Sequence, residues 1–211
     1  GMSVRGLIEQ SNVKLICTTD DPADDLHWHE KIAADASCKV RVLPAFRPDK
    51  AMNVDKPGFA AYMARLSAAA GCPIRSFAEL ETALCARIDY FAAHGCRVSD
   101  HALDSTVYAP ADEKTLDAIF VQAMQGVVSA EKAAQFKTAV LMAVSKKYAQ
   151  LGWVMQIHYG CLRNNSTKWF EALGSDTGFD SVNDAGGAAA LAGLLNAMQA
   201  GGHLPKMVLY S

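Results

Sequence analysis

The chain has 211 residues, of which 51% are hydrophobic and 20% charged, and its formal net charge is −2. This length and composition suit one sizeable hydrophobic core, and the small net charge gives no field that would attract nucleic acid or an anionic membrane. No apolar run approaches the roughly 18 residues of a transmembrane helix, so we expect a cytoplasmic protein with no membrane or nucleic-acid partner.

Short apolar runs rich in β-branched residues alternate with helical stretches along the chain. The predicted strands are Val13–Cys17, Val40–Phe46, Cys96–Ser99, Trp153–His158 and Met207–Tyr210. Each run is apolar along nearly its whole length, which is typical of parallel strands that are covered on both faces.

The predicted helices fill the gaps between these strands. They are Ala23–Ala36, Phe77–His94, Ala130–Leu151 and Ala188–Ala200. Ser76 and Glu79 form a capping box at the start of the second helix, while Ser129 and Gly152 bound the third. Strand–helix alternation predicts an α/β fold, which we interpret as part of a (β/α)8 TIM-type barrel with extra helices in the loops. Because such a barrel needs eight strands, we expect residues 1–211 to form a single, incomplete domain cut from a longer fold.

Six cysteines occur in the sequence, and none of them belongs to a C-x-x-C pair. They are Cys17, Cys38, Cys72, Cys85, Cys96 and Cys161. Apolar neighbours favour small buried hydrophobes in a reducing compartment over a zinc or redox site.

Polar and charged residues stand where the predicted strands end. They are Arg47 after the second strand, Asp100 after the third, His158 at the end of the fourth, and Arg163 and Asn164 shortly beyond it. In α/β barrels the site lies beyond the carboxyl ends of the strands, so we expect these side chains to converge. Guanidinium groups bind carboxylate or phosphate, and aspartate and histidine exchange protons or accept hydrogen bonds. The set predicts a site for a small anionic substrate rich in hydroxyl groups.

Each of these residues also has a purely structural interpretation. Arg47 could form an ion pair with the loop residue Asp49, Asp100 could cap a helix or a turn, and His158 could be a core histidine. The metal-pair pattern His27-Trp28-His29 is discounted, because it begins a predicted helix, where residues i and i+2 diverge by about 200°.

Several strings together resemble the uronate (glucuronate) isomerase family. They are Gln156–Asn165, Gly174–Ser181, Cys17–Pro22, Leu43–Lys50 and Gly95–His101. The family is a divergent branch of the amidohydrolase superfamily with a distorted (β/α)8 barrel. The resemblance covers nearly the whole chain and implies that it corresponds to about strands two to six of that barrel. It also implies hexuronate catabolism, in which D-glucuronate is isomerised to D-fructuronate and D-galacturonate to D-tagaturonate.

The resemblance implies a role for each candidate residue. Arg47 and Arg163 would hold the substrate carboxylate or a developing oxyanion, with Asn164 as a further substrate contact and Arg163 also counted as catalytic. Asp100 would bind hydroxyls or transfer a proton, and His158 would be catalytic and a candidate metal ligand. The resemblance also implies that the complete family enzyme binds a divalent metal, which we expect to be zinc. The first-strand H-x-H pair and the eighth-strand aspartate have no counterpart here, so we expect the chain alone to bind metal weakly or not at all and to turn over little uronate.

Two other functions stay open. One is a metal-dependent hydrolase of the same superfamily, which would need a metal-activated water. The other is a catalytically dead remnant that serves as a binding or oligomerising module. Exposed strand edges would favour a homo-oligomer in that case.

Overall fold

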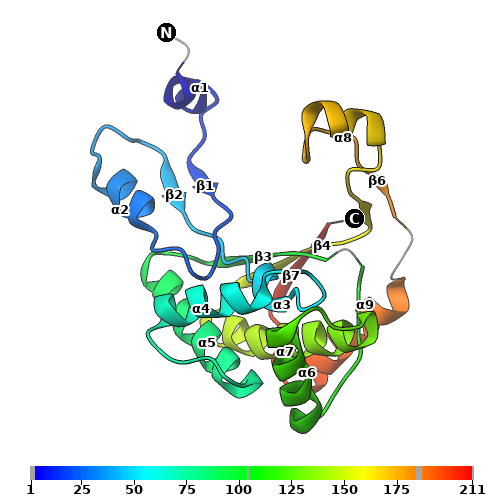
Figure 1. The fold of residues 1–211 in the computed structure, drawn as a ribbon. Helices are drawn as coiled ribbons and strands as arrows, with labels where there is room; N and C mark the ends of the chain where they lie inside the picture. The colour runs from blue at the N-terminus through cyan, green and yellow to red at the C-terminus, as the bar shows by residue number, and fades with distance from the viewer. Residues whose placement is uncertain (1–2, 104, 184–186, 211) are drawn as a thin grey trace.

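The computed structural model describes residues 3–103, 105–183 and 187–210 as alternating strands and helices (Figure 1). The strands are β1 (Leu15–Cys17), β2 (Arg41–Leu43), β3 (Val98–Ala102), β4 (Val154–His158), β5 (Cys161–Leu162), β6 (Ser181–Val182) and β7 (Lys206–Tyr210). The helices are α1 (Val4–Gln10), α2 (His27–Ala34), α3 (Asp49–Met52), α4 (Phe59–Ala70), α5 (Phe77–Ala93), α6 (Glu113–Gln125), α7 (Ala130–Leu151), α8 (Thr167–Leu173) and α9 (Ala188–Ala200).

Five of the strands are parallel and follow one another across the fold. β1 pairs with β2, and β3, β4 and β7 form a second sheet in that order. Phe46 joins the two sheets, because it forms parallel bridges to Asp20 on one side and to Ser99 on the other. β5 and β6 make a separate antiparallel pair. The pairing confirms an α/β fold with parallel strands.

Helices α3 to α7 and α9 gather on one side of the strands, while α1, α2 and α8 lie on the other (Figure 1). The hydrophobic core lies between the strands and the first group of helices. Phe46 is fully buried there, edge to face with Phe91 of α5 at 5.0 Å and with Tyr148 of α7 at 6.2 Å between ring centroids. Burying side chains of this size stabilises the fold by about 2 kcal/mol each. This core fixes the strand segment that leads directly into Arg47.

The helix boundaries expected for Ala130–Leu151 and Ala188–Ala200 are confirmed. Ser129 caps α7 by accepting a hydrogen bond from Lys132 N, and Gly152 ends it with φ of 67°. At α5, Ser76 accepts from Glu79 N as expected. The reciprocal half of that capping box is wrong, because the Glu79 carboxylate binds Arg75 instead.

The expected strands Val13–Cys17 and Val40–Phe46 are shorter in the structure, at Leu15–Cys17 and Arg41–Leu43. Two further boundaries are wrong for clear physical reasons. β3 does not stop at Ser99, because its ladder with β4 continues through Asp100 to Ala102. The helix expected from Ala23 begins only at His27. Aspartate side chains upstream accept hydrogen bonds from backbone N–H groups of residues 23, 26 and 27, which holds that segment in turns.

All six cysteines are free thiols, but the expectation that all of them are buried holds only for Cys96. Cys96 is buried, Cys17 is exposed, and the other four are partly exposed. None of the helices in the described residues combines the length and apolar composition needed to cross a bilayer.

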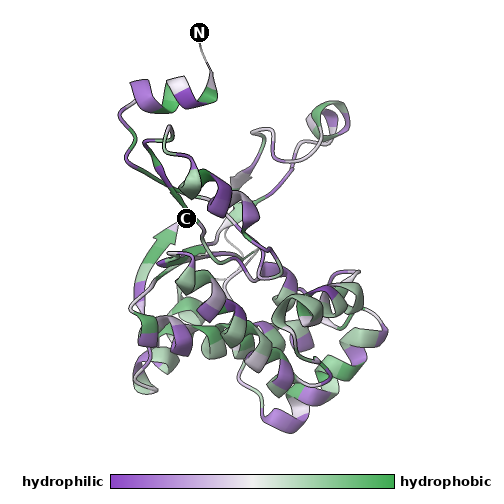
Figure 2. Cartoon of the chain, turned by 90° about the vertical axis from the view of Figure 1, so that its left-hand side faces the viewer, coloured by the Kyte–Doolittle hydropathy of each residue, from purple (hydrophilic) through white to green (hydrophobic). Residues whose placement is uncertain are grey.

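The last strand has one open side. Val208, Leu209 and Tyr210 are 38%, 40% and 42% exposed, and Figure 2 shows β7 as mostly hydrophobic beside the C-terminus. β7 pairs only with β4 in the described part of the chain, so it forms an edge of the parallel sheet.

Candidate functional site

Arg47, Asp100 and His158 meet at the carboxyl end of the parallel strands. His158 Nε2 lies 2.8 Å from Asp100 Oδ1, and Arg47 Nη1 lies 3.4 Å from Asp100 Oδ2. The Asp100 side chain is 9% exposed, whereas Arg47 and His158 are 33% and 39% exposed. A buried carboxylate therefore sits between a guanidinium and an imidazole that both still reach solvent.

The strand register explains this convergence. Asp100 of β3 pairs with Gln156 of β4, and His158 follows Gln156 by two residues, so both β4 side chains share a face. Ala102, His158 and Tyr210 are register partners at the ends of β3, β4 and β7. The strand ends thus bring together residues that are far apart in sequence.

The structural interpretations of the three residues are resolved by this geometry. Asp100 lies inside a strand, so it caps neither a helix nor a turn, and the exposure of His158 excludes a core histidine. Arg47 does pair with Asp49, through a hydrogen bond of 2.7 Å from Nε to Oδ2, and it contacts Asp100 as well. Burial raises the pKa of Asp49, and the Arg47 guanidinium opposes that shift.

The buried oxygen Oδ1 of Asp100 faces His158, whose Nε2 lies 2.8 Å away. A buried carboxylate oxygen is costly without a donor or an opposite charge, and the His158 imidazole is the group placed to supply one.

A divalent metal does not fit the described residues on their own. His158 and Asp100 offer two metal-binding side chains, and the described part of the chain contains no cluster of three or more. Zinc sites in proteins use three or four protein ligands, and the cationic Arg47 beside Asp100 would repel a divalent ion.

Tyr210 and Gln156 support His158, and the sequence interpretation missed both. The Tyr210 ring stacks on the imidazole at 4.4 Å with an interplanar angle of 10°. Its hydroxyl donates to Gln156 Oε1 at 2.8 Å, and Gln156 Nε2 donates to the Ser99 carbonyl at 3.3 Å. One polar residue within an apolar strand, two positions before His158, was the signal that could have identified Gln156.

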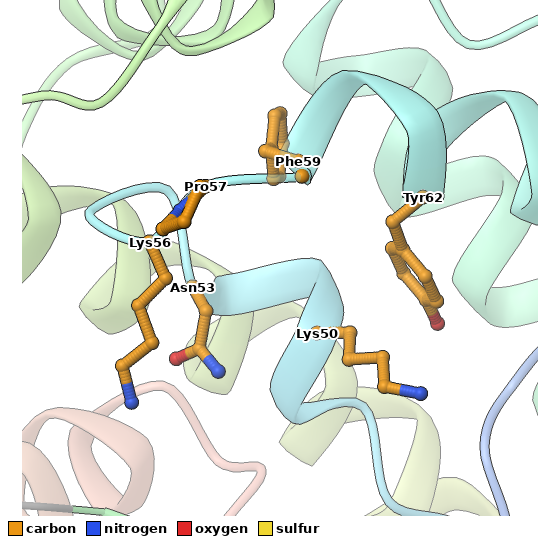
Figure 3. A pocket seen from close by; sticks show the side chains of 7 residues that line it. Lys50, Asn53, Lys56, Pro57, Phe59 and Tyr62 are labelled. Atoms are coloured by element: carbon orange, nitrogen blue, oxygen red, sulfur yellow. The ribbon is translucent and has the colours of Figure 1, made fainter.

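Two cavities share Lys50 as a lining residue, and one of them is also lined by Arg47. The first has a volume of about 220 Å³ and is lined by Thr19, Asp20, Asp21, Arg47, Asp49 and Lys50. The second, of about 250 Å³, is shown in Figure 3 and is lined by Lys50, Asn53, Lys56, Pro57, Gly58, Phe59 and Tyr62.

Lys50 lines both cavities, and its amine lies 3.2 Å from Asp21 Oδ2. Tyr62 donates its hydroxyl proton to Asp21 Oδ1 at 3.1 Å. Burial raises the pKa of Tyr62 far above its ordinary value, so it stays a donor at neutral pH. Two donors therefore hold Asp21 at the junction of the cavities.

Arg163 and Asn164 are engaged elsewhere. Arg163 Nη1 lies 2.7 Å from Asp180 Oδ2, and Asn164 N donates to Asp180 Oδ1 at 2.8 Å. The hydrogen bonds from the Asn164 backbone and from Arg163 lower the pKa of Asp180. The structure ties both residues to the chain before β6, and their contact with a substrate stays a prediction.

The two histidines of the His27-Trp28-His29 pattern lie on α2 and have separate partners outside that helix. His27 Nδ1 lies 2.6 Å from Asp25, whereas His29 Nε2 lies 2.7 Å from the Thr18 hydroxyl. Discounting this pattern as a metal pair agrees with the geometry.

A buried histidine, His101, lies on the opposite face of β3 from Asp100. His101 is fully buried, with Nε2 3.2 Å from the Ser99 hydroxyl. Burial lowers the pKa of His101 to about 3, and Arg47 and His158 add to the shift. This imidazole is neutral in the folded protein.

Comparison with known proteins identifies the family. A sequence model described as glucuronate isomerase matches residues 1–211. The chain belongs to the glucuronate isomerase family. Uronate isomerases of Lachnoclostridium phytofermentans and Yersinia pseudotuberculosis are 51% and 53% identical to it over 211 and 209 residues. Those alignments cover 100% and 99% of this chain but only 45% of each relative, so the chain spans just under half of their length.

Solved structures of the glucuronate isomerase family have a similar fold. The crystal structure of uronate isomerase from Thermotoga maritima matches with a TM-score of 0.88 at 32% identity, covering 99% of this chain and 46% of that one. Glucuronate isomerase from Caulobacter crescentus matches with a TM-score of 0.79 at 27% identity, covering 92% and 40%. The arrangement of strands and helices described above is thus the arrangement found in part of these larger proteins.

Proposed function

We propose that this chain forms part of the substrate-binding wall of a uronate isomerase. The substrates would be D-glucuronate, isomerised to D-fructuronate, and D-galacturonate, isomerised to D-tagaturonate. The observation that carries the proposal is the convergence of Arg47, Asp100 and His158 at the ends of parallel strands. A hexuronate offers one carboxylate and several hydroxyls, which match a half-exposed guanidinium and a buried carboxylate acceptor.

The isomerisation moves a proton from C2 of the aldose to C1, while the O2 proton is lost and O1 is protonated. Arg47 would bind the carboxylate or an oxygen that becomes negative during this transfer. Asp100, which pairs with His158, would accept a hydrogen bond or a proton from a sugar hydroxyl. His158 directs Nε2 toward Asp100, which leaves Nδ1 to meet the substrate. Arg163 and Asn164 are proposed as further substrate contacts.

The five parallel strands are proposed to be a segment of a (β/α)8 barrel within one domain. Their order and the likeness to two solved family structures support this interpretation. In such a barrel the carboxyl ends of the strands carry the site, which agrees with the position of Asp100 and His158.

A divalent metal belongs to the proposal only for the complete enzyme. His158 would be one ligand, and the described residues do not complete a set with it. The steps above therefore use only side chains of this chain. For the same reason we expect the 211-residue chain by itself to isomerise D-glucuronate slowly; a rate typical of enzymes would contradict that expectation.

Binding specificity tests the proposal. Affinities for D-glucuronate, D-galacturonate and D-glucose are to be measured by calorimetry for the wild type, Arg47→Gln and Arg5→Gln. Arg5 is the matched control, because it also pairs with an aspartate, Asp35, but it lies on α1 and outside the candidate site. We expect both uronates to bind, D-glucose to bind at least tenfold more weakly, and Arg47→Gln alone to weaken uronate binding by about tenfold. Equal affinity for D-glucose, or full affinity in Arg47→Gln, would refute the proposal.

A further inference from the structure

Asp49 contacts the two strand ends that carry the candidate site without lying at its centre. It is the first residue of α3, and its side chain is 18% exposed. Oδ2 accepts a hydrogen bond from Arg47 Nε at 2.7 Å, and both carboxylate oxygens lie 3.3 Å from the backbone N of Ala102. One carboxylate thus connects the segment after β2 to the end of β3.

The contacts of Asp49 determine how Arg47 is presented. Nε is held by Asp49 and Nη1 lies 3.4 Å from Asp100, so the planar guanidinium is fixed at two points. The group is nevertheless 33% exposed and lines the cavity of about 220 Å³. Because a guanidinium donates from a rigid fork, fixing one edge of the fork sets the direction of the other.

The contact with Ala102 extends the same control to His158. Ala102 is the register partner of His158, and Leu103 N donates to the His158 carbonyl at 2.9 Å. Asp49 therefore holds the Arg47 guanidinium directly. Through the backbone amide of Ala102 it also holds the end of β3, which lies next to His158.

We propose that Asp49 is a positioning residue, which orients the Arg47 guanidinium so that its exposed edge receives the carboxylate of the ligand. Asp49 lines the same cavity, but it acts on the ligand carboxylate through Arg47, because an ionised carboxylate has no hydrogen to donate to another. The identity of the ligand as a hexuronate rests on the proposed function, whereas the ordering of Arg47 by Asp49 does not.

A double-mutant cycle on D-glucuronate binding tests this role. The variants are Asp49→Ala, Arg47→Ala and the double variant, with Asp55→Asn as the control, because Asp55 pairs with Lys137 at 3.0 Å away from these residues. We expect Asp49→Ala to weaken binding by about tenfold in the wild type and to have no further effect once Arg47 is removed. Asp49→Asn retains an acceptor for Arg47 Nε and is expected to restore most of the affinity. Unchanged affinity in Asp49→Ala, or additive losses in the double variant, would overturn the proposal.

A separate signal distinguishes failure of this proposal from failure of the proposed function. The Arg47 Nε–Hε resonance should be resolved and slow to exchange in the wild type without ligand, and it should broaden or exchange rapidly in Asp49→Ala. If the wild type binds no D-glucuronate but this change occurs, the hexuronate assignment fails while the ordering of Arg47 by Asp49 stands. If the resonance is the same in both proteins, the positioning role is wrong.

Discussion

Replacement of His101 by glutamine should remove much of the protein's sensitivity to mild acid. His101 is fully buried, and burial lowers its pKa from 6.5 to about 3. The unfolded chain therefore binds a proton at a pH where the folded chain does not. A base with a depressed pKa favours folding above its unfolded value, and that contribution is lost as the pH falls from about 6.5 toward 3.

The magnitude follows from the shift. Each pKa unit corresponds to about 1.4 kcal/mol, so the full shift is worth on the order of 5 kcal/mol. Between pH 7 and pH 5 the protonation of the unfolded imidazole alone lowers the free energy of unfolding by about 2 kcal/mol. Against a typical domain stability of about 5–15 kcal/mol, this loss is large enough to measure.

Urea unfolding at pH 7, 6 and 5 gives the required comparison. We expect the fall in unfolding free energy between pH 7 and pH 5 to be about 2 kcal/mol smaller in His101→Gln than in the wild type. Ser145→Ala is the control, because Ser145 is also fully buried but carries no group that titrates in this pH range. Equal pH dependence in the wild type and His101→Gln would refute the reasoning. If His101→Gln does not fold, NMR titration of the wild type decides, because the His101 imidazole should stay neutral down to about pH 4.

Three further predictions concern stability and association. Arg87→Met should lower the free energy of unfolding in urea by about 3 kcal/mol, because Arg87 is 7% exposed and its guanidinium donates to the carbonyls of residues 22, 24 and 69, which would lose their donors. A loss below about 1 kcal/mol would contradict this. Gly152→Ala should cost about 1 kcal/mol in the same assay, because Gly152 ends α7 with φ of 67°, and equal stability would contradict the strain. Leu209→Lys should reduce concentration-dependent self-association in sedimentation, because Leu209 is 40% exposed on edge strand β7. A wild type that is monomeric at every concentration would contradict the predicted homo-oligomer.

The regular elements were predictable because their signals are local. Ser129 and Gly152 are a cap and a stop that act within one turn, so the bounds of α7 follow from the sequence. The start of α2 was not predictable in the same way, because turns formed by aspartate side chains compete with the helix over residues 23–26.

The extent of β3 and the composition of the site depend on contacts between distant segments. Ser99, Asp100 and His101 have the polarity of a loop, but pairing with β4 keeps them in a buried strand, and Tyr148 of α7 packs against His101. The convergence of Arg47, Asp100 and His158 was predicted from strand order alone. The stacking of Tyr210 on His158 was not, because it depends on which strand lies next to β4.

Arg163 illustrates the limit of sequence distance. It follows His158 by five residues, which suggested a position on the same rim of the site. The chain instead enters β5 directly after β4 and pairs with β6, where Asp180 binds the guanidinium. A partner seventeen residues further along the chain could not be read from the strand pattern.

Chemical-shift mapping of D-glucuronate on the isotopically labelled chain tests the central claim most directly. The account predicts saturable shifts at millimolar concentrations for the backbone amides of Arg47, Asp100 and His158, with no comparable change in α6 or at Asp55. D-glucose at the same concentrations should leave these amides unmoved. Saturable shifts confined to other parts of the chain, or none for D-glucuronate at any concentration, would contradict the account.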